Sequence, residues 1–288
     1  MLSYQHAYHA GNHADILKHY VLNFVLKSMN KKDKPYTFFD THSGSGLYDL
    51  LDNRSLKTGE AESGIKHLLQ ELKEKGGDGL KTLPDSFADY ISFVEPYTKK
   101  NTYPGSPEIE RKLLRPCDSL VLSELHPQEI ENLKKNMQDS LPKLQVHKQN
   151  GFELLNALTP PSTKRGAVLI DPSYEEKADF EQVFKTVAQV HKKWSGGIFM
   201  IWYPLLDRRE IELNTMLEAL ERNVRSVNAN TEILKLELCV RDKNPLQKEN
   251  AAHLYGSGMF IINPPWKLAE EGSLVAEKLS AFFRSMPS

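Results

Sequence analysis

Two strand-like runs that each end in an acidic residue constrain the fold of this chain most strongly. The first run is Phe38-Phe39-Asp40, which leads into a glycine-rich turn over residues 41–46. The second is Leu169-Ile170-Asp171, and a proline follows it directly. In open α/β sheets, ligands bind in the crevice beyond the carboxyl ends of the strands. The sequence therefore predicts a Rossmann-like α/β fold with its functional site at that edge.

Strand-like and helix-like patterns alternate along most of the chain. Apolar residues at helical spacing predict an amphipathic helix over residues 14–28. The strand-like runs are residues 36–39, 119–123, 144–148, 166–170, 197–203, 233–240 and 259–262, and helical patterns at 128–137, 180–194 and 208–222 separate most of them. This alternation predicts a parallel sheet with helices on both faces. The last two runs have no helix between them, so we expect a closing antiparallel hairpin.

Residues 51–103 interrupt the alternation. They contain two helical patterns, residues 60–75 and 85–94, around a glycine-rich linker at residues 76–79. We interpret this stretch as a small helical insertion after the first strand and turn. The expected organisation is an N-terminal segment with the start of the core at residues 1–52, a helical insertion subdomain at 53–102, and the remainder of the core at 103–288.

Composition excludes several classes of protein. The chain is 40% hydrophobic and 26% charged, which is typical of a soluble globular protein. Its net charge of -1 means that any binding of nucleic acid must depend on a local basic patch. Cys117 and Cys239 are far apart, which favours a reduced intracellular protein without a cysteine zinc site. No apolar run reaches the roughly 20 residues that cross a bilayer, and the N-terminus lacks an apolar signal stretch, so we expect a cytoplasmic protein with no membrane partner.

The glycine-rich turn has the pattern Asp-x-x-x-Gly-x-Gly at Asp40, Gly44 and Gly46. Glycines there let the backbone approach a nucleoside cofactor closely. The strand at residues 119–123 is followed by Glu124, whose carboxylate can accept hydrogen bonds from both ribose hydroxyls of an adenosine. The alternative is an ordinary tight turn beside a solvated glutamate.

The turn Asp171-Pro172-Ser173-Tyr174 indicates the chemistry. An amino nitrogen conjugated with a purine ring must free its lone pair before it can attack a sulfonium methyl group. A carboxylate and the Pro172 carbonyl, accepting its two N–H bonds, favour that geometry, while an aromatic ring stacks on the flipped base. We therefore predict S-adenosylmethionine-dependent methylation of a nucleobase amino group, with Asp171 and Tyr174 as catalytic residues. An ordinary strand-exit turn is the alternative.

A second turn, Asn263-Pro264-Pro265-Trp266, matches the spelling of an amino-methyltransferase signature better. Chain order argues against it, because it ends the last strand of the sheet, whereas Asp171 ends the strand that follows the two cofactor turns. We assign Asn263 and Trp266 to the wall of the active site or to structure.

The histidines of the N-terminal region raise the question of a metal site. His6, His9 and His13 fall at helical offsets, and His19 and His42 follow. A tetrahedral site would need further nearby ligands, and neither cysteine is close in sequence. Neutral imidazoles that bind a cofactor or phosphate explain the cluster, so no metal is expected. For Lys18 and His19, solvated positions on the helix are an alternative.

Taken together, these motifs resemble the ribosomal RNA large subunit methyltransferase J family, which methylates N6 of an adenine in 23S rRNA with S-adenosylmethionine. The resemblance covers nearly the whole chain. It is carried by Leu2-Ser3-Tyr4, residues 9–19, Asp40-Thr41-His42, Tyr103-Pro104-Gly105-Ser106-Pro107, Glu124-Leu125-His126-Pro127, the Asp171 turn, Trp202-Tyr203-Pro204, Ser257-Gly258-Met259 and residues 263–268.

The resemblance implies a class I methyltransferase sheet and assigns roles to individual residues. Asp171 would be the catalytic acceptor and would also adjoin the cofactor, and Tyr4 and Lys18 would lie at the substrate side of the same site. The residues implied to contact S-adenosylmethionine are His19, His42, Ser106, Glu124, Asn150 and Gly151. The implied partner is 23S rRNA, free of protein or early in assembly. We expect the chain to be a monomer.

Two positions depart from the family pattern. The family usually has an aspartate where this chain has Asn150, whose carbonyl oxygen can still accept a hydrogen bond from the adenine amino group. Ser173 replaces a second proline, which bears on rate and base selectivity. A DNA adenine-N6 methyltransferase and a catalytically impaired RNA-binding relative are the alternative functions. Candidate phosphate contacts are Lys31, Lys32, Lys34, Lys99 and Lys100, although a solvated lysine face explains any one of them equally well.

Overall fold

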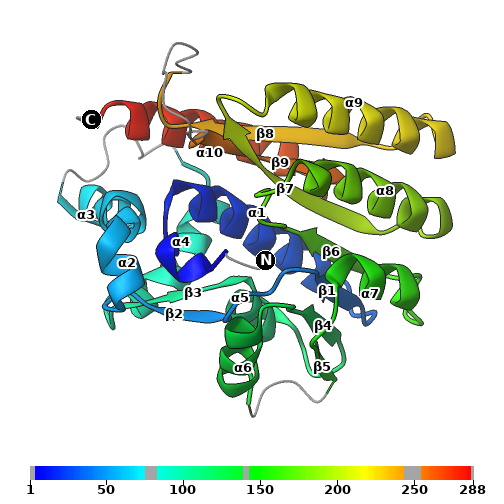
Figure 1. Cartoon of the computed structure of the whole chain (residues 1–288), viewed down its shortest axis with the longest axis horizontal. Helices are drawn as coiled ribbons and strands as arrows, with labels where there is room; N and C mark the ends of the chain where they lie inside the picture. The colour runs from blue at the N-terminus through cyan, green and yellow to red at the C-terminus, as the bar shows by residue number, and fades with distance from the viewer. Residues whose placement is uncertain (1–3, 75–82, 139–142, 243–253, 287–288) are drawn as a thin grey trace.

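A seven-stranded sheet forms the centre of the protein (Figure 1). The computed structural model describes residues 4–74, 83–138, 143–242 and 254–286. The strand order is β5-β4-β1-β6-β7-β9-β8, and β9 is antiparallel to both of its neighbours while the other pairs are parallel. The strands are β1 (Thr37–Asp40), β4 (Ser119–Ser123), β5 (Leu144–His147), β6 (Gly166–Ile170), β7 (Ile198–Leu206), β8 (Ile233–Cys239) and β9 (Leu254–Ile262).

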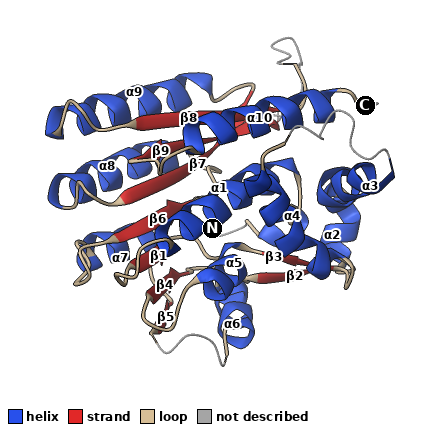
Figure 2. Cartoon of the chain, turned by 180° about the vertical axis from the view of Figure 1, so that it is seen from behind, coloured by secondary structure: helices blue, strands red, loops and turns tan. Residues whose placement is uncertain are grey.

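Helices cover both faces of the sheet, as the two opposite views show (Figures 1 and 2). One face packs against α1 (His13–Asn30), α5 (Ser106–Leu113), α6 (Pro127–Asn136) and α10 (Leu268–Arg284). The other packs against α7 (Gly151–Leu158), α8 (Lys177–Lys193) and α9 (Glu210–Val227). Every residue of β1 and β6 is buried, as expected for central parallel strands between two helical layers.

The insertion lies beside α1 at one end of the molecule (Figure 1). It contains α2 (Asn53–Thr58), a π-helical turn η2 (Glu62–Lys66), α3 (His67–Glu74) and α4 (Asp85–Thr98). A short antiparallel pair, β2 (Leu47–Asp49) and β3 (Thr102–Pro104), joins the two ends of this segment. The insertion therefore leaves and re-enters the core at one place, next to the glycine-rich turn.

The strand pattern, the main helices and the closing antiparallel strand are confirmed. The sequence patterns did not predict α5, α7, α10 or the β2–β3 pair. The expected linker at residues 76–79 lies outside the described residues, as do Leu2 and Ser3. Within the described ranges, no helix is long and apolar enough to cross a membrane.

Candidate active site

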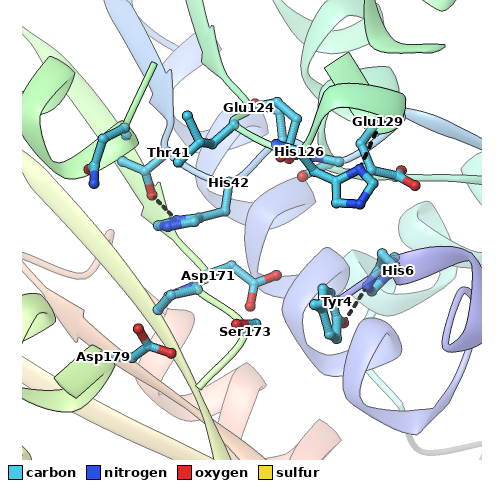
Figure 3. Close-up of a pocket in the computed structure, with 18 of the residues that line it drawn as sticks. Tyr4, His6, Thr41, His42, Glu124, His126, Glu129, Asp171, Ser173 and Asp179 are labelled. Carbon is cyan, nitrogen blue, oxygen red and sulfur yellow. Dashed lines mark hydrogen bonds between the residues drawn. The ribbon is translucent and has the colours of Figure 1, made fainter. Parts of the chain in front are cut away.

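The carboxyl ends of β1, β4, β5 and β6 open into a cavity of about 430 Å³ (Figure 3). The N-terminal segment, α1, α5 and the start of α7 complete its walls. Nine of the residues singled out from the sequence line it: Tyr4, Lys18, His19, His42, Ser106, Glu124, Asn150, Gly151 and Asp171. Residues from seven separate segments of the chain thus meet in one place, which is the arrangement that the strand-end argument predicted.

Glu124 is tied to the glycine-rich turn. Its Oε2 accepts a hydrogen bond from the Gly44 N–H at 2.8 Å, and its Oε1 accepts one from the His126 N–H at 2.7 Å. Gly44 has φ +58°, and a Cβ there would overlap the Tyr48 hydroxyl. Burial raises the pKa of Glu124. The interpretation as a solvated glutamate beside an ordinary turn is therefore wrong.

Asn150 and Gly151 form the start of α7. Asn150 Oδ1 accepts the Phe152 N–H at 2.9 Å and the Glu153 N–H at 3.3 Å, which is a helix N-cap. This oxygen is committed to the helix, so the expected hydrogen bond from an adenine amino group to it is not favoured. The group left for a ligand is the amide NH₂, a donor that matches an acceptor nitrogen of a purine ring. Gly151 has no room for a side chain, because a Cβ would overlap the Thr41 carbonyl oxygen.

His42 is a neutral imidazole with a defined tautomer. Burial lowers its pKa to about 4. The Thr41 hydroxyl donates to the Leu169 carbonyl, so it must accept from His42 Nδ1, which lies 2.8 Å away. Nε2 is then the unprotonated acceptor nitrogen of the ring. The imidazole also packs edge-on against Phe152, with 4.9 Å between ring centroids.

His19 and Lys18 are buried on α1, so their interpretation as solvated helix residues is wrong. His19 Nδ1 lies 3.0 Å from the Tyr103 hydroxyl, and burial lowers its pKa to about 3. Lys18 is 5% exposed, and its Nζ lies 2.6 Å from Asp171 Oδ2 and 2.9 Å from Asp15 Oδ1. Burial alone would lower the pKa of Lys18, but the two carboxylates outweigh it and raise that pKa above its usual value.

The ion pair between Lys18 and Asp171 fixes how the Asp171 carboxylate faces the cavity. Lys18 holds Oδ2, and among the described residues no hydrogen bond reaches Oδ1. Asp15, on the other side of Lys18, also accepts the Gly11 N–H and lies 2.9 Å from His6 Nε2. The His6 ring then continues to Tyr4, whose hydroxyl is 2.9 Å from His6 Nδ1 (Figure 3). Asp171 is the end of a polar chain that runs from the N-terminal segment through α1.

Tyr174 does not line the cavity. Its side chain is 3% exposed, and its ring packs against Phe180 and Trp202. Its hydroxyl donates to the Trp202 carbonyl at 2.7 Å. The predicted stacking of this ring on a flipped base is therefore not supported by the conformation of the turn, in which Tyr174 has φ +53°. Pro172 and Ser173 of the same turn do line the cavity.

The second proline-rich turn lies at the amino ends of the parallel strands, on the side of the sheet away from the cavity. Because β9 is antiparallel, its last residue, Ile262, pairs with Phe199 and Ile233 at the starts of β7 and β8. Asn263 Nδ2 donates to the carbonyls of Ser195 and Gly197, and Trp266 is 81% exposed. The assignment of these residues to the active-site wall is wrong, and the structural role is confirmed for Asn263.

The lysines predicted to contact phosphate lie away from the cavity. Lys31, Lys32 and Lys34 follow the far end of α1, and at about 1.5 Å per helical residue Lys31 is about 20 Å from Lys18. Lys99 and Lys100 follow α4, where Lys99 pairs with Glu95 at 3.2 Å. These residues do not contact a nucleotide held in the cavity. In the part of the chain that the structure describes, no three His, Cys, Asp or Glu side chains are placed to hold a metal ion.

Comparisons with known proteins identify the family. The family described as ribosomal RNA large subunit methyltransferase D, RlmJ, matches residues 33–283. A curated relative from Escherichia coli K12, named ribosomal RNA large subunit methyltransferase J, is 39% identical over 274 residues, which cover 94% of this chain and 90% of the relative. This chain belongs to the RlmJ family. A Haemophilus influenzae relative of the same name is 39% identical over 272 residues, covering 93% and 89%.

A solved structure with a comparable sequence identity to this chain supports the fold. The crystal structure of protein LPL1258 from Legionella pneumophila matches with a TM-score of 0.77 and 35% identity, covering 96% of this chain and 94% of that one. Membership of the RlmJ family, together with a single antiparallel strand in the sheet, makes this a class I methyltransferase fold.

Sequence reasoning missed several residues of this RlmJ-family site. Asp15 is the most important, because its carboxylate forms an ion pair with the Lys18 ammonium group on the side away from Asp171. The spacing of Asp15, Lys18 and His19 on one face of a helix was the signal that could have found it. The other residues missed along the cavity wall are Tyr48, Gln149, Phe152, Glu129, Glu175, Glu176 and Asp179.

Proposed function

We propose that this RlmJ-family chain methylates N6 of an adenine in 23S rRNA, with S-adenosylmethionine as the methyl donor. Family membership supports the methylation of ribosomal RNA. The observation that carries the chemistry is the position of Asp171, which ends β6 at the cavity with Lys18 on one carboxylate oxygen and the other oxygen open.

The residues around the cavity fit an adenosine joined to an amino acid chain. Glu124 offers a carboxylate for ribose hydroxyls, and the Asn150 amide stands at the start of α7. His42 and His19 are neutral, so neither repels the positive charge of a sulfonium. When bound, S-adenosylmethionine supplies a methyl group on a positively charged sulfur. Gly44 and Gly151 keep the backbone close on both sides, where a side chain would not fit.

Asp171 and Pro172 orient the target amino group. Oδ1 of Asp171 and the carbonyl of Pro172 accept its two N–H bonds, which draws the nitrogen lone pair out of conjugation with the ring. Because Lys18 anchors Oδ2, the carboxylate cannot rotate away from the nitrogen. As the bond between this nitrogen and the methyl carbon forms, the bond from that carbon to the donor sulfur would break, leaving the neutral thioether S-adenosylhomocysteine. The nitrogen, then positively charged, must lose a proton, and Oδ1 is the acceptor in contact with it.

The aromatic contact to the base is proposed for Tyr4. Its ring lines the cavity, is 37% exposed and stacks on His9 with an interplanar angle of 13°. Its hydroxyl is held by His6, so the ring is positioned before a base arrives. Tyr174, which is buried, supports the turn instead.

The substrate is tested by incubating the chain and labelled S-adenosylmethionine with three matched substrates, followed by mass spectrometry of the digested nucleosides. The substrates are protein-free 23S rRNA, assembled large subunits and DNA of the same sequence. We expect N6-methyladenosine at one position of the protein-free RNA and far less in the other two. Equal methylation of the DNA would contradict the assignment of RNA as the substrate. Intact cofactor binding without any methylated product would indicate a relative that has lost catalysis.

We further propose that the chain acts as a monomer in the cytoplasm, where ribosomal RNA is matured. The support is that one chain supplies every residue that the proposed chemistry uses. Sedimentation of the chain with and without RNA fragment tests the first part, and a dimer in the active complex would contradict it.

A further inference from the structure

Two carboxyl groups are buried side by side beneath the glycine-rich turn. Asp40 ends β1 and is 1% exposed, and Glu110 lies on α5 and is 0% exposed. Among the described residues, neither makes an ion pair with a lysine or arginine. Burying two acids without a cation is costly, so this pair needs an explanation.

Glu110 and Ser106 present the same face of α5 to Asp40. They are four residues apart, which places them one above the other on a helix. Ser106 Oγ donates to Asp40 Oδ2 at 2.7 Å, and the His42 N–H donates to Asp40 Oδ1 at 3.1 Å. The side chains of Glu110 and Asp40 act directly on each other, and within the described ranges neither Glu110 oxygen accepts a hydrogen bond from an N–H or hydroxyl group.

Two adjacent carboxyl groups in a dry site cannot both be charged. Burial, followed by the charge of Asp40, raises the pKa of Glu110 well above its usual value. Burial also raises the pKa of Asp40, to about 6, against the lowering effect of its hydrogen bonds. Within the described part of the chain, Asp40 accepts two hydrogen bonds and Glu110 accepts none, so the negative charge of the pair belongs on Asp40 and the shared proton on Glu110.

Among the described residues, Asp40 is the charged neighbour that acts on Glu110. The elements packed against α5 are α1, β1, β3 and β4. Their buried ionisable residues are Asp15, Lys18, His19 and Tyr20 on α1, Asp40 on β1 and Tyr103 on β3, while β4 has none. Of these, Asp40 is the one whose charge acts on Glu110. Asp171, at the end of β6, adds to the raised pKa of Asp40.

We propose that Glu110 is a positioning residue of the cofactor site: its neutral carboxyl group donates a hydrogen bond to Asp40, and Asp40 in turn fixes the start of the glycine-rich turn. Asp40 holds the His42 N–H, and Ser106, which shares Asp40, lines the cavity. Glu110 itself is too deeply buried to touch a ligand. The inference rests on the proposed use of this cavity for S-adenosylmethionine.

The test measures the affinity of S-adenosylmethionine by calorimetry for the full chain and three variants. Glu110→Gln keeps a neutral donor, so we expect an affinity within about twofold of the original chain at pH 7. Glu110→Ala leaves Asp40 a buried charge with one donor fewer, and we expect binding about tenfold weaker or worse. Glu108→Gln is the matched control, because Glu108 is buried on the same helix but faces Tyr97 and Arg111; its affinity should not change.

Cofactor affinity measured over a series of pH values distinguishes two roles of Glu110. It either donates a hydrogen bond through its proton or only fills space in the core. The raised pKa of Glu110 means that its contribution is complete at low pH and is lost as pH rises through that value. As pH rises above neutral and through the raised pKa of Glu110, binding to the original chain should weaken relative to Glu110→Gln. The ratio of the two dissociation constants is the quantity to compare, because the amino group of the ligand titrates in the same range and cancels.

Three results would overturn the proposal. They are a folded Glu110→Ala variant that binds as well as the original chain, a Glu110→Gln variant as weak as Glu110→Ala, and a ratio that stays flat with pH. Circular dichroism and thermal unfolding identify any variant that fails to fold. If the original chain does not bind S-adenosylmethionine at all, the proposed function fails instead, which is a distinct result.

Discussion

At the scale of single residues, the site is organised by one buried cation. Lys18 sits between Asp15 and Asp171, and each carboxylate is within 3 Å of its ammonium group. A lysine in this position does two things. It neutralises two acids that would otherwise repel each other, and it leaves Asp171 a single free oxygen for a substrate. The structural and catalytic roles of Lys18 therefore cannot be separated by removing it alone.

Replacement of Lys18 by methionine should reduce both stability and activity. Two buried carboxylates would lose their shared cation, and breaking a buried pair in this way costs about 3 kcal/mol of the free energy of unfolding. The matched control is Lys27→Met on the same helix, whose pair with Asp89 is exposed and should contribute less than about 1 kcal/mol. Urea denaturation of both variants at pH 7 measures the difference, and equal losses would contradict this account.

Tyr174 shows how a correct motif can carry an incorrect residue role. The sequence places an aromatic residue three positions after Asp171, and its usual role is to stack on a base. The backbone at Tyr174 is left-handed, with φ +53°, which turns the ring into the core between Phe180 and Trp202. A backbone dihedral of this kind has no signature in the spacing of residues, so the sequence could not have predicted it.

At the scale of elements, the cavity depends on close contact between α7 and the end of β1. Gly151 begins α7 directly against the Thr41 carbonyl, and Asn150 caps the helix at the same point. The distance between these two elements sets the width of the cavity on its adenosine side. Sequence analysis identified Asn150 and Gly151 only through resemblance, because α7 is short and its pattern was not recognised as a helix.

Replacement of Gly151 by alanine should therefore impair both folding and cofactor binding. The new Cβ meets backbone atoms, which cannot rotate away, so α7 must shift; overpacking of this kind costs about 1–3 kcal/mol. Gly196→Ala is the matched control, since nothing lies within 4 Å of its Cβ position and the change should be nearly neutral. Thermal unfolding and calorimetric titration with S-adenosylmethionine measure the two effects. Unchanged affinity in a folded Gly151→Ala variant would contradict the proposed placement.

The parts of the fold that the sequence predicts and those it does not differ in how far apart in the sequence the interacting residues lie. Strands such as β6 were readable because five buried apolar residues leave no other local interpretation. The pair β2–β3 was not, because it joins residues that are separated by the whole insertion. Glu110 was equally invisible: its burial depends on α5 packing against β1, and an acidic residue in a helix normally indicates a solvated face.

At the scale of the whole molecule, the site connects distant parts of the chain. The N-terminal segment, α1, and the exits of four strands all contribute side chains, so the cavity exists only when the complete core has assembled. Of the candidate phosphate-binding lysines, Lys31, Lys32 and Lys34 follow the far end of α1, and Lys99 and Lys100 follow α4. A large RNA can reach these lysines, but they have no part in holding the target base. The chemistry is therefore confined to the carboxyl ends of the parallel strands.

The central claim is that Asp171 accepts the hydrogen bonds and the proton of the target amino group. The most direct test is single-turnover methyl transfer to protein-free 23S rRNA by Asp171→Asn, with Glu181→Gln, an exposed residue of α8 paired with Lys185, as the control. We expect Asp171→Asn to be slower by at least about 100-fold while it remains folded, and the control to be unchanged. An Asp171→Asn variant that transfers methyl groups at a rate near that of the original chain would contradict the account.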